Sequence, residues 1–515
     1  MGNMNQNEIE SNQRIKKGAI VSYIAIIVNI LAGLLFTPWM INQIGQSSYG
    51  LYTLAVSVIS IFTIDFGLSA AVSRFVSKYH AENKQSSINK MLSVTYRLYF
   101  LIDILILIAL IVVYFNIDLI YQELTINELE KFKVVYIMAA TFSLISFPAI
   151  PFNGILSAYE YFVEMKLADL IQRLAIVGLI AFALLNGLGL YAVVAANAIG
   201  GLIAIVYKFI ILKKMTTVKI DLTYHDNQVI KEILGFSTWS AIAGIAQRFI
   251  FNITPTILGI VSGTSSIAIF AIASALESYV YTIASALNGL FLPKVSRIVS
   301  QEKASENILE LMIKIGRIQL IIIGLITIGF ISVGQDFILL WMGDGYSSAY
   351  YSAIFLILPS IIYLPQQIGN TAVVALNKVK QQAVVFTLMA IINIALSFIL
   401  SSYYGVLGGS IAIFIAYTFR SVGMNVIFKR SLNIDILKYF KECHFKFIIP
   451  QGIVLLLGIS LNLLPLRLSW MNLLIKGFLL VAIYSIVTWT FIMNTYEKQL
   501  IKGVINLGSA KIKKN

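Results

Sequence analysis

Long apolar runs alternate with short polar breaks along nearly the whole chain. A helix needs roughly 20 apolar residues to cross the hydrocarbon core of a bilayer. Fourteen such runs occur, with boundaries that the pattern places to within a few residues: 18–41, 50–72, 92–115, 133–157, 167–186, 190–212, 233–258, 267–293, 315–335, 350–375, 382–401, 405–428, 447–465 and 470–493. The pattern predicts an all-α polytopic membrane protein with fourteen transmembrane helices and no large soluble domain.

Composition agrees with the pattern. Hydrophobic residues make up 58% of the 515 residues and charged residues only 12%, with a mean hydropathy of +0.85, whereas about a quarter of a soluble domain is charged. The first 17 residues are polar and the apolar run that follows is too long for a signal core, so no cleaved signal is expected. One cysteine excludes an internal disulfide, and the three histidines lie in polar connections, so neither a metal site nor a cofactor is expected.

Basic residues indicate the orientation of the chain. With both termini in the cytoplasm, thirty of the 38 Lys and Arg residues lie in cytoplasmic segments, and only Lys131, Lys133 and Arg467 lie in outer ones. This distribution follows the positive-inside rule. The net charge of +14 would then face the anionic inner leaflet, so a nucleic-acid partner is not needed to explain it.

An internal repeat divides the chain. The phrase SRFVS at 73–77 returns as SRIVS at 296–300, and further matches share an offset of 216 or 217: Thr37-Pro38 with Thr254-Pro255, Ser48 and Ser57 with Ser265 and Ser274, Pro148, Asn153 and Ala158 with Pro365, Asn370 and Ala375, and Ile211 to Lys214 with Ile427 to Arg430. An even number of helices per repeat predicts two parallel six-helix lobes followed by two further helices. The predicted segments are a cytoplasmic N-terminus (1–17), a first lobe (18–214), a linker (215–232), a second lobe (233–430), an appended helix pair (431–493) and a cytoplasmic tail (494–515).

Two mid-span charges, Arg248 and Glu277, are the main candidates for a binding site. An ionisable side chain at mid-bilayer costs about 3 kcal/mol, so it normally faces a partner or a wet cavity. The two residues either pair with each other or line a polar cavity in which Arg248 meets an anionic group, and Gln247, Asn252 and Asn29 would add polar atoms there. The planar guanidinium fork suits phosphate.

The remaining intramembrane charges have other predicted roles. Asp65, Asp103 and Glu277 are candidates for carrying H⁺ or Na⁺. Structural interpretations apply to Asp169 with Arg173, spaced for an intrahelical pair, and to Lys476, near enough to the outer surface to snorkel. Arg97 and Arg420 lie within reach of the inner surface. The prolines of helices 1, 7, 4 and 10 are either hinges or static kinks: Pro38, Pro255, Pro148 and Pro365.

Three stretches resemble the multidrug/oligosaccharidyl-lipid/polysaccharide (MOP) flippase superfamily, and within it the Wzx-like polysaccharide transport branch: "LLFTPWMINQIGQSSYGLYTLAVSV", "DFGLSAAVSRFVSKY" and "YYGVLGGSIA". The resemblance implies a V-shaped pair of lobes whose cavity is lined by helices 1, 2, 7 and 8. It also implies that the protein is not an enzyme but moves a polyprenyl-diphosphate-linked oligosaccharide to the outer leaflet of a bacterial plasma membrane. Membrane lipids and other polysaccharide-assembly proteins would be its partners.

Three other functions remain open at this point. A cation-coupled multidrug exporter of the same superfamily would usually stop at twelve helices and favour acidic cavity charge. A lipid II flippase would share the fourteen helices but is expected to carry several arginines in the first lobe. A membrane glycan polymerase needs catalytic residues in a sizeable loop, and the outer loops 116–132 and 336–349 carry no compact acidic motif.

Overall fold

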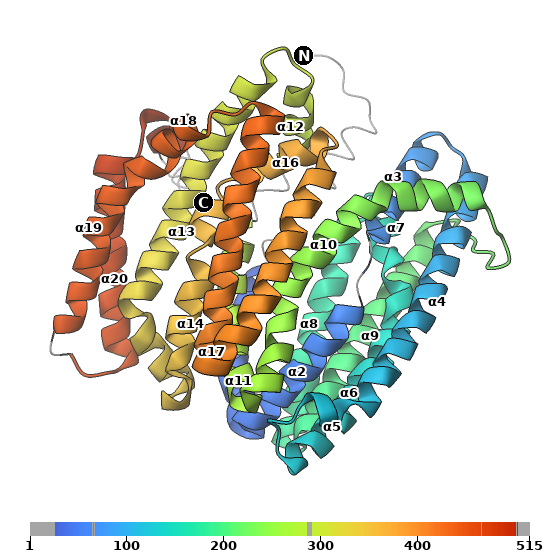
Figure 1. Ribbon diagram of the computed structural model, residues 1–515, viewed down its shortest axis with the longest axis horizontal. Coiled ribbons are helices and arrows are strands. Elements are labelled where there is room, and N and C mark those ends of the chain that lie inside the picture. The colour runs from blue at the N-terminus through green and yellow to red at the C-terminus, as the bar shows by residue number, and fades with distance from the viewer. Residues whose placement is uncertain are drawn as a thin grey trace, which may run out of the picture. The chain divides into compact units, whose positions relative to one another are not determined.

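Helices make up all the regular secondary structure that the computed structural model describes, namely residues 26–500 without 64, 66, 286–290 and 465, together with Lys502. The predicted N-terminal segment 1–17 and most of the predicted tail lie outside these residues. After a helix over Ile26–Ile44, the longer helices are α2 (Gln46–Phe62), α3 (Leu68–Ala81), α4 (Gln85–Phe115), α6 (Ile126–Ser146), α8 (Phe162–Leu185), α9 (Leu190–Met215), α10 (Asn227–Val261), α11 (Gly263–Ser285), α13 (Ala304–Met342), α17 (Val379–Leu432), α19 (Lys446–Ser460) and α20 (Trp470–Val487) (Figure 1).

Shorter helices interrupt or connect the long ones. They are α5 (Ile117–Ile120), α7 (Pro151–Ala158), α12 (Leu292–Val299), α14 (Ser348–Ile357), α15 (Ser360–Tyr363), α16 (Gln367–Ala375) and α18 (Ile436–Phe440). The predicted interruptions at Pro148 and Pro365 are present. Pro148 lies in a 3-10 turn between α6 and α7, and Pro365 lies between α15 and α16, because proline cannot donate the backbone hydrogen bond of a continuing helix.

Twelve spans in the described part of the chain are long and apolar enough to cross a membrane, so the protein is a multi-pass membrane protein. The predicted ranges 382–401 and 405–428 both fall within α17, whose backbone leaves the helical region at Gly405 (φ 55°, ψ −130°). The predicted continuous helix over 50–72 is wrong, since the chain breaks there between α2 and α3. The count of fourteen crossings therefore stays a prediction.

The repeat offset of 217 reappears in the local backbone. α8 begins at Phe162 and α17 at Val379, and α9 ends at Met215 and α17 at Leu432. Shortly after α7 and α16 end, Glu160 (φ 60°) and Asn377 (φ 56°) both adopt the left-handed conformation that commonly terminates helices. The two halves of the sequence thus share helix boundaries as well as residues, which supports a duplication.

The helices form two compact units. The first contains residues up to Ala271 with Phe386–Ala412, and the second contains Ile272–Val385 with the chain from Ile413 onward. α10, which the repeat assigns to the second lobe, belongs to the first unit. The predicted lobe boundaries stay predictions.

Apolar side chains fill the interior of each unit and also cover much of its outside. Met40, Leu184 and Val193 form a buried cluster in the first unit, and Val454 with Leu480 does so in the second. At the same time Leu105 of α4 and Phe478 of α20 are 66% and 76% exposed. Large apolar side chains on an outer surface are stable when lipid covers them.

Candidate functional site

The break between α2 and α3 is organised around Asp65. The Ser69 backbone N–H donates to both carboxylate oxygens of Asp65, at 3.2 and 3.3 Å. The Tyr99 hydroxyl of α4 donates to Oδ1, and Gly67 takes the left-handed conformation (φ 71°) that the turn requires. Asp65 therefore satisfies backbone groups that a broken helix exposes. Discontinuous helices at membrane depth are a recurrent feature of transporter binding sites.

Arg248 of α10 belongs to the same part of the first unit. Its side chain is exposed, and its charge is close enough to act electrostatically on the Asp65 carboxylate. Gln247 is half-buried beside it, and Asn29 is exposed on the helix Ile26–Ile44. An exposed guanidinium on a membrane-length helix needs water or an anion near it, since the hydrocarbon of the bilayer does not solvate its charge.

Pro255 lies within α10, which curves along its length (Figure 1). Side chains from other helices donate to backbone carbonyls close to it: Asn393 Nδ2 to Ile250 at 3.3 Å, and the Ser57 hydroxyl to Asn252. Such bonds satisfy carbonyls near the proline. They stabilise the bend, while the predicted hinge role of Pro255 and of Pro38 on the first helix stays a prediction.

A carboxylate joins three helix starts in the first unit. Glu128 Oε1 accepts from the Ser47 hydroxyl at 2.5 Å and from the Thr264 hydroxyl at 2.7 Å, and Glu128 closes a capping box with Thr125 at the start of α6. Ser47 and Thr264 are separated by 217 residues, which is the repeat offset. We call these residues the Glu128 junction. Sequence reasoning missed it, although Thr125 and Glu128 carry a readable capping-box spacing.

Asp103 is half-buried on α4, and its Oδ1 is buried without a hydrogen-bond partner in the described part of the chain. Its neighbours along α4, Ile102, Leu105 and Ile106, line an apolar cavity of 410 Å³ with residues of α2 and α3. Arg97, two turns earlier, is exposed. Asp103 thus remains a candidate for carrying a proton or an ion.

Glu277 of α11 is buried in the second unit, where it is 6% exposed. The Tyr363 hydroxyl donates to its Oε1 at 3.2 Å. The Arg420 guanidinium lies over the rings of Tyr363 and Tyr417, at 5.0 and 5.3 Å from their centroids, and the two rings are themselves 5.0 Å apart. We call these four residues the Glu277 cluster.

The Glu277 cluster changes one prediction and adds residues that the sequence analysis did not name. Arg420 is only 3% exposed and contacts aromatic faces, so the expectation that its charge reaches the inner surface is wrong. Tyrosines complete the surroundings of Glu277, and no sequence motif marks them. Arg248 and Glu277 belong to different units, so their predicted pairing stays a prediction.

Two other charge predictions are corrected by the structure. Lys476 does not snorkel but is 7% exposed and forms an ion pair with Asp336 of α13 at 2.8 Å. Asp169 pairs with Lys166 and Lys208, each at 3.4 Å, rather than with Arg173. The prediction considered residues on the same helix, whereas the neighbouring α9 supplies one of these partners.

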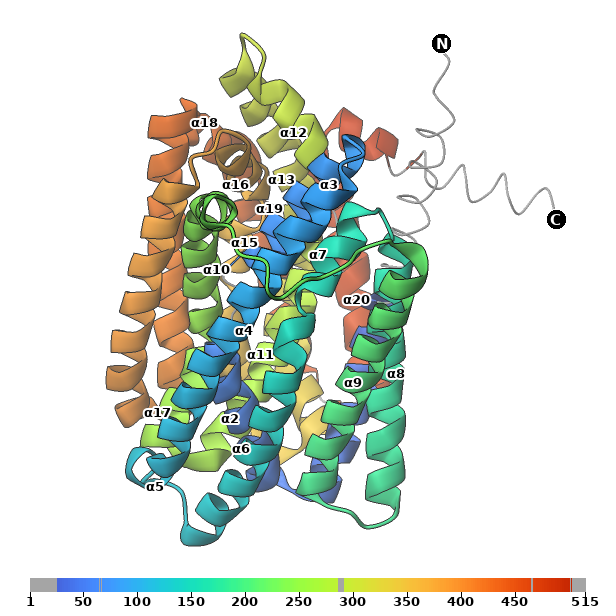
Figure 2. The same ribbon diagram turned by 90° about the vertical axis from the view of Figure 1, so that its right-hand side faces the viewer.

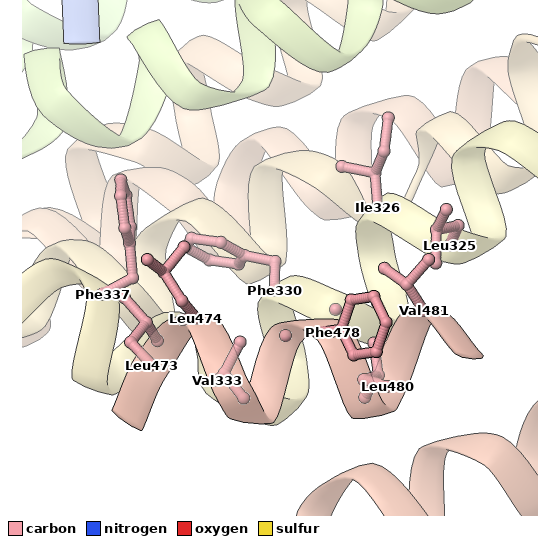
Figure 3. A pocket seen from close by; sticks show the side chains of 13 residues that line it. Leu325, Ile326, Phe330, Val333, Phe337, Leu473, Leu474, Phe478, Leu480 and Val481 are labelled. Atoms are coloured by element: carbon pink, nitrogen blue, oxygen red, sulfur yellow. The ribbon is translucent and has the colours of Figure 1, made fainter. Parts of the chain in front are cut away.

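An apolar groove of 680 Å³ lies between α13 and α20 (Figure 3). Phe330 and Phe337 come from α13, and Leu473, Leu474 and Phe478 from the appended helix pair. Figure 3 shows these side chains gathered along the two helices, with carbon atoms alone at their ends. The lining suits a hydrocarbon chain.

The described residues contain no cluster of His, Cys, Asp and Glu that could hold a metal ion. Membrane-length helices, a discontinuous span and buried intramembrane charges define the class of a multi-pass membrane transport protein.

Comparisons with known proteins define the group within that class. Residues 15–299 match the family model described as "Polysaccharide biosynthesis protein", and the chain belongs to that family. The "Uncharacterized membrane protein EpsK" of Bacillus subtilis (strain 168) is 22% identical over 513 residues, which cover 94% of this chain and 98% of the relative.

Solved structures share the fold. A "Lipid II flippase MurJ, inward closed conformation" covers 94% of this chain and 99% of its own, with a TM-score of 0.71 and 15% identity. An inward-facing multidrug resistance MATE family transporter of the MOP superfamily covers 81% of this chain and 98% of its own, with a TM-score of 0.59 and 15% identity. The predicted membership in the MOP flippase superfamily is confirmed.

Proposed function

We propose that this protein moves a polyprenyl-diphosphate-linked oligosaccharide repeat unit from the inner to the outer leaflet of a bacterial plasma membrane by alternating access. The repeat unit would serve a capsule, an O-antigen or a similar surface glycan. Family membership carries this proposal. In it the protein is a transporter rather than an enzyme, both termini are cytoplasmic, and other polysaccharide-assembly proteins supply and use the cargo.

Exposed Arg248 is the proposed contact for the diphosphate. Arginine keeps its charge at all physiological pH values and donates two parallel hydrogen bonds to phosphate oxygens. Gln247, Asn252 and Asn29 would supply further donors and acceptors for the sugars. Asp65, near Arg248, would hold the guanidinium in place when no cargo is bound.

The groove between α13 and α20 supports a lipid-linked cargo. A sugar diphosphate cannot cross hydrocarbon without a polar path, but its polyprenyl chain is stable wherever apolar surface surrounds it. The apolar side chains of the groove provide that surface on the helix pair that follows the two predicted lobes.

Coupling to H⁺ or Na⁺ would go through Glu277, with Asp65 and Asp103 as further candidates. A buried carboxylate costs less free energy when protonated or when bound to a cation. Tyr363 contacts this carboxylate, and Arg420 lies over the Tyr363 ring, so a change in the charge of Glu277 would alter the packing of α15 and α17. An inside-negative potential also favours outward movement of anions by about 2.3 kcal/mol per charge per 100 mV.

Deletion of the gene followed by analysis of lipid-linked intermediates tests the proposed function. The proposal predicts that repeat units accumulate on the cytoplasmic leaflet and that surface glycan is lost. Unchanged glycan with altered drug sensitivity would favour the multidrug exporter, and accumulation of a peptidoglycan precursor would favour the lipid II flippase. Shorter surface glycans without accumulation of repeat units on the inner leaflet would favour a polymerase.

A further inference from the structure

The connection between α9 and α10, residues 216–226, is attached to α4 by a regular series of hydrogen bonds. Gln85 Nε2 donates to the Thr217 carbonyl at 3.4 Å, the Lys219 N–H donates to Asn89 Oδ1 at 3.1 Å, and the Asp221 N–H donates to Ser93 Oγ at 2.8 Å. Figure 2 shows this connection as the extended green stretch that leads to α10. We call residues 216–221 the strap.

Matching spacings explain the series. Residues four apart on a helix lie on one face about 6 Å from each other, and residues two apart in an extended chain lie about 6.6 Å from each other. Gln85, Asn89 and Ser93 follow the first spacing, and Thr217, Lys219 and Asp221 follow the second. The strap can therefore lie along α4 with each bond in register, which holds the Lys219 backbone beside the helix.

A polar pocket of 470 Å³ lies between the strap and α4. Its lining contains two lysines, two serines and one residue each of four other types: Lys90, Lys219, Ser86, Ser93, Asn89, Ile220, Asp221 and Tyr224. The Lys90 ammonium lies 5.7 Å from the Tyr224 ring centroid. In the described part of the chain neither Lys90 nor Lys219 forms an ion pair with a carboxylate within 4 Å.

Asp221 is the one carboxylate in the lining. The side chain of Thr223 donates to its Oδ1 at 2.6 Å and the backbone N–H of Thr223 at 2.9 Å. These bonds hold the pKa of Asp221 below its usual range, so this carboxylate stays ionised. Two lysines against one hydrogen-bonded carboxylate leave the pocket with a net positive charge.

The pocket lies at the polar N-terminal end of a candidate membrane span, because α4 begins with Gln85 and contains the apolar stretch that ends at Phe115. The phosphate groups of a bilayer occupy this depth, and anionic headgroups are attracted to clustered lysines there. Lys213 and Lys214 in the last turn of α9 add positive charge immediately before the strap in the sequence.

We propose that the strap and α4 form a binding site for the phosphate headgroup of an anionic membrane phospholipid, with Lys90 and Lys219 as its cationic ligands. A bound headgroup draws the strap and α4 together. The last hydrogen bond of the strap is at Asp221, and Asp226 caps the first turn of α10. Only residues 222–225 therefore connect the strap to α10. Binding does not depend on the proposed cargo, whereas any effect on lobe movement rests on the proposed function.

Binding of a fluorescent short-chain phosphatidylglycerol to the purified full-length protein in a neutral detergent tests the site. We expect saturable binding that is about 30-fold weaker in Lys90→Ala/Lys219→Ala, since each lysine contributes attraction to an anionic headgroup. The matched control, Lys213→Ala/Lys214→Ala, removes the same charge outside the pocket and should bind within a few-fold of the wild type. Lys90→Gln/Lys219→Gln repeats the test if the alanine variant does not fold.

Hydrogen exchange of residues 216–226 localises the effect. In lipid nanodiscs these amides should exchange more slowly with phosphatidylglycerol present than in phosphatidylcholine alone, and the lysine variants should abolish the difference. Equal exchange in both membranes, or equal loss of binding in both variant pairs, overturns the proposal. Protection by inorganic phosphate alone in phosphatidylcholine would also overturn it, because the ligand would then be a free anion.

Discussion

Buried charged residues in this chain form ion pairs with residues that are distant in the sequence. Arg317 of α13 donates to Glu497 through Nε at 2.6 Å and through an η nitrogen at 3.0 Å, and both side chains are at most 4% exposed. The backbone carbonyls of Glu442 and Ile492 each accept one further hydrogen bond from the guanidinium. From the sequence, Arg317 is counted among the cytoplasmic basic residues and Glu497 is placed in the cytoplasmic tail, because neither the burial of the two residues nor their pairing can be read from the sequence.

Arg317→Ala should lower the free energy of unfolding by about 3–5 kcal/mol, because it leaves the Glu497 carboxylate buried without its partner. Lys446→Ala is the control, since Lys446 pairs with Glu442 while 53% exposed and an exposed pair contributes at most about 1 kcal/mol. Thermal unfolding in detergent compares the two variants. Equal losses would show that the Arg317 pair contributes no more than a surface pair.

Asp226 should give the start of α10 a dependence on pH. The backbone N–H groups of Val229 and Gln228 hold the pKa of Asp226 below its usual range. A carboxylate with a lowered pKa stabilises the folded state above its unfolded pKa of about 3.9, and that contribution is lost as the pH falls through the folded pKa.

Exchange of the amides in the first turn of α10 should therefore accelerate below about pH 4, after correction for intrinsic rates. Asp226→Asn keeps a capping side chain and should remove this pH dependence. The same pH dependence in the Asn variant would contradict the role assigned to the Asp226 carboxylate.

At the scale of elements, hydropathy located most of the long helices, because a bilayer-spanning run is a strong signal. Helix ends and helix breaks are harder to predict from hydropathy. α13 continues to Met342, about two turns past its predicted end, and α2 stops at Phe62 inside a predicted span. Side chains from other helices stabilise such features, as Tyr99 does at Asp65. The candidate residues could be listed from sequence, but the tyrosines of the Glu277 cluster could not, since only packing brings them to the carboxylate.

Close contact between α2 and the start of α11 depends on Gly50. A Cβ atom at this position would lie 2.3 Å from the Thr264 carbonyl oxygen, which is backbone and cannot rotate away. Gly50→Ala should destabilise the protein by about 1–3 kcal/mol, as overpacking does. Gly244→Ala in α10 meets no atom within 4 Å and should be neutral or stabilising by up to about 1 kcal/mol. Thermal unfolding distinguishes the variants, and a neutral Gly50→Ala would contradict this packing.

At the scale of the molecule, the Glu128 junction brings together equivalent positions of the two sequence repeats. Ser47 and Thr264 are equivalent positions of the two sequence repeats, and both donate to one carboxylate. In the proposed alternating-access cycle the equivalent helices of the two lobes separate at one membrane face. The Glu128 junction is then a contact that has to open during each cycle.

Ser47→Cys/Thr264→Cys should form a disulfide on oxidation, because the two hydroxyl oxygens are 3.4 Å apart and a disulfide needs closely spaced side chains. The crosslinked protein should lose transport and regain it after reduction. Each single cysteine variant should keep transport under the same oxidant, and native Cys443 is buried. Full transport by the crosslinked protein would show that the Glu128 junction does not open.

Lipid flipping by the purified protein in liposomes tests the proposed transport most directly. A polyprenyl-diphosphate-linked oligosaccharide is incorporated into one leaflet of the liposomes, and its appearance in the other leaflet is followed with a membrane-impermeant glycosidase. We expect flipping by the wild type and by Arg97→Ala, and a flipping rate at least about tenfold lower for Arg248→Ala, as expected when a charged hydrogen bond of roughly 1.5–3 kcal/mol is removed. Flipping by Arg248→Ala at the wild-type rate would contradict recognition of the diphosphate by Arg248.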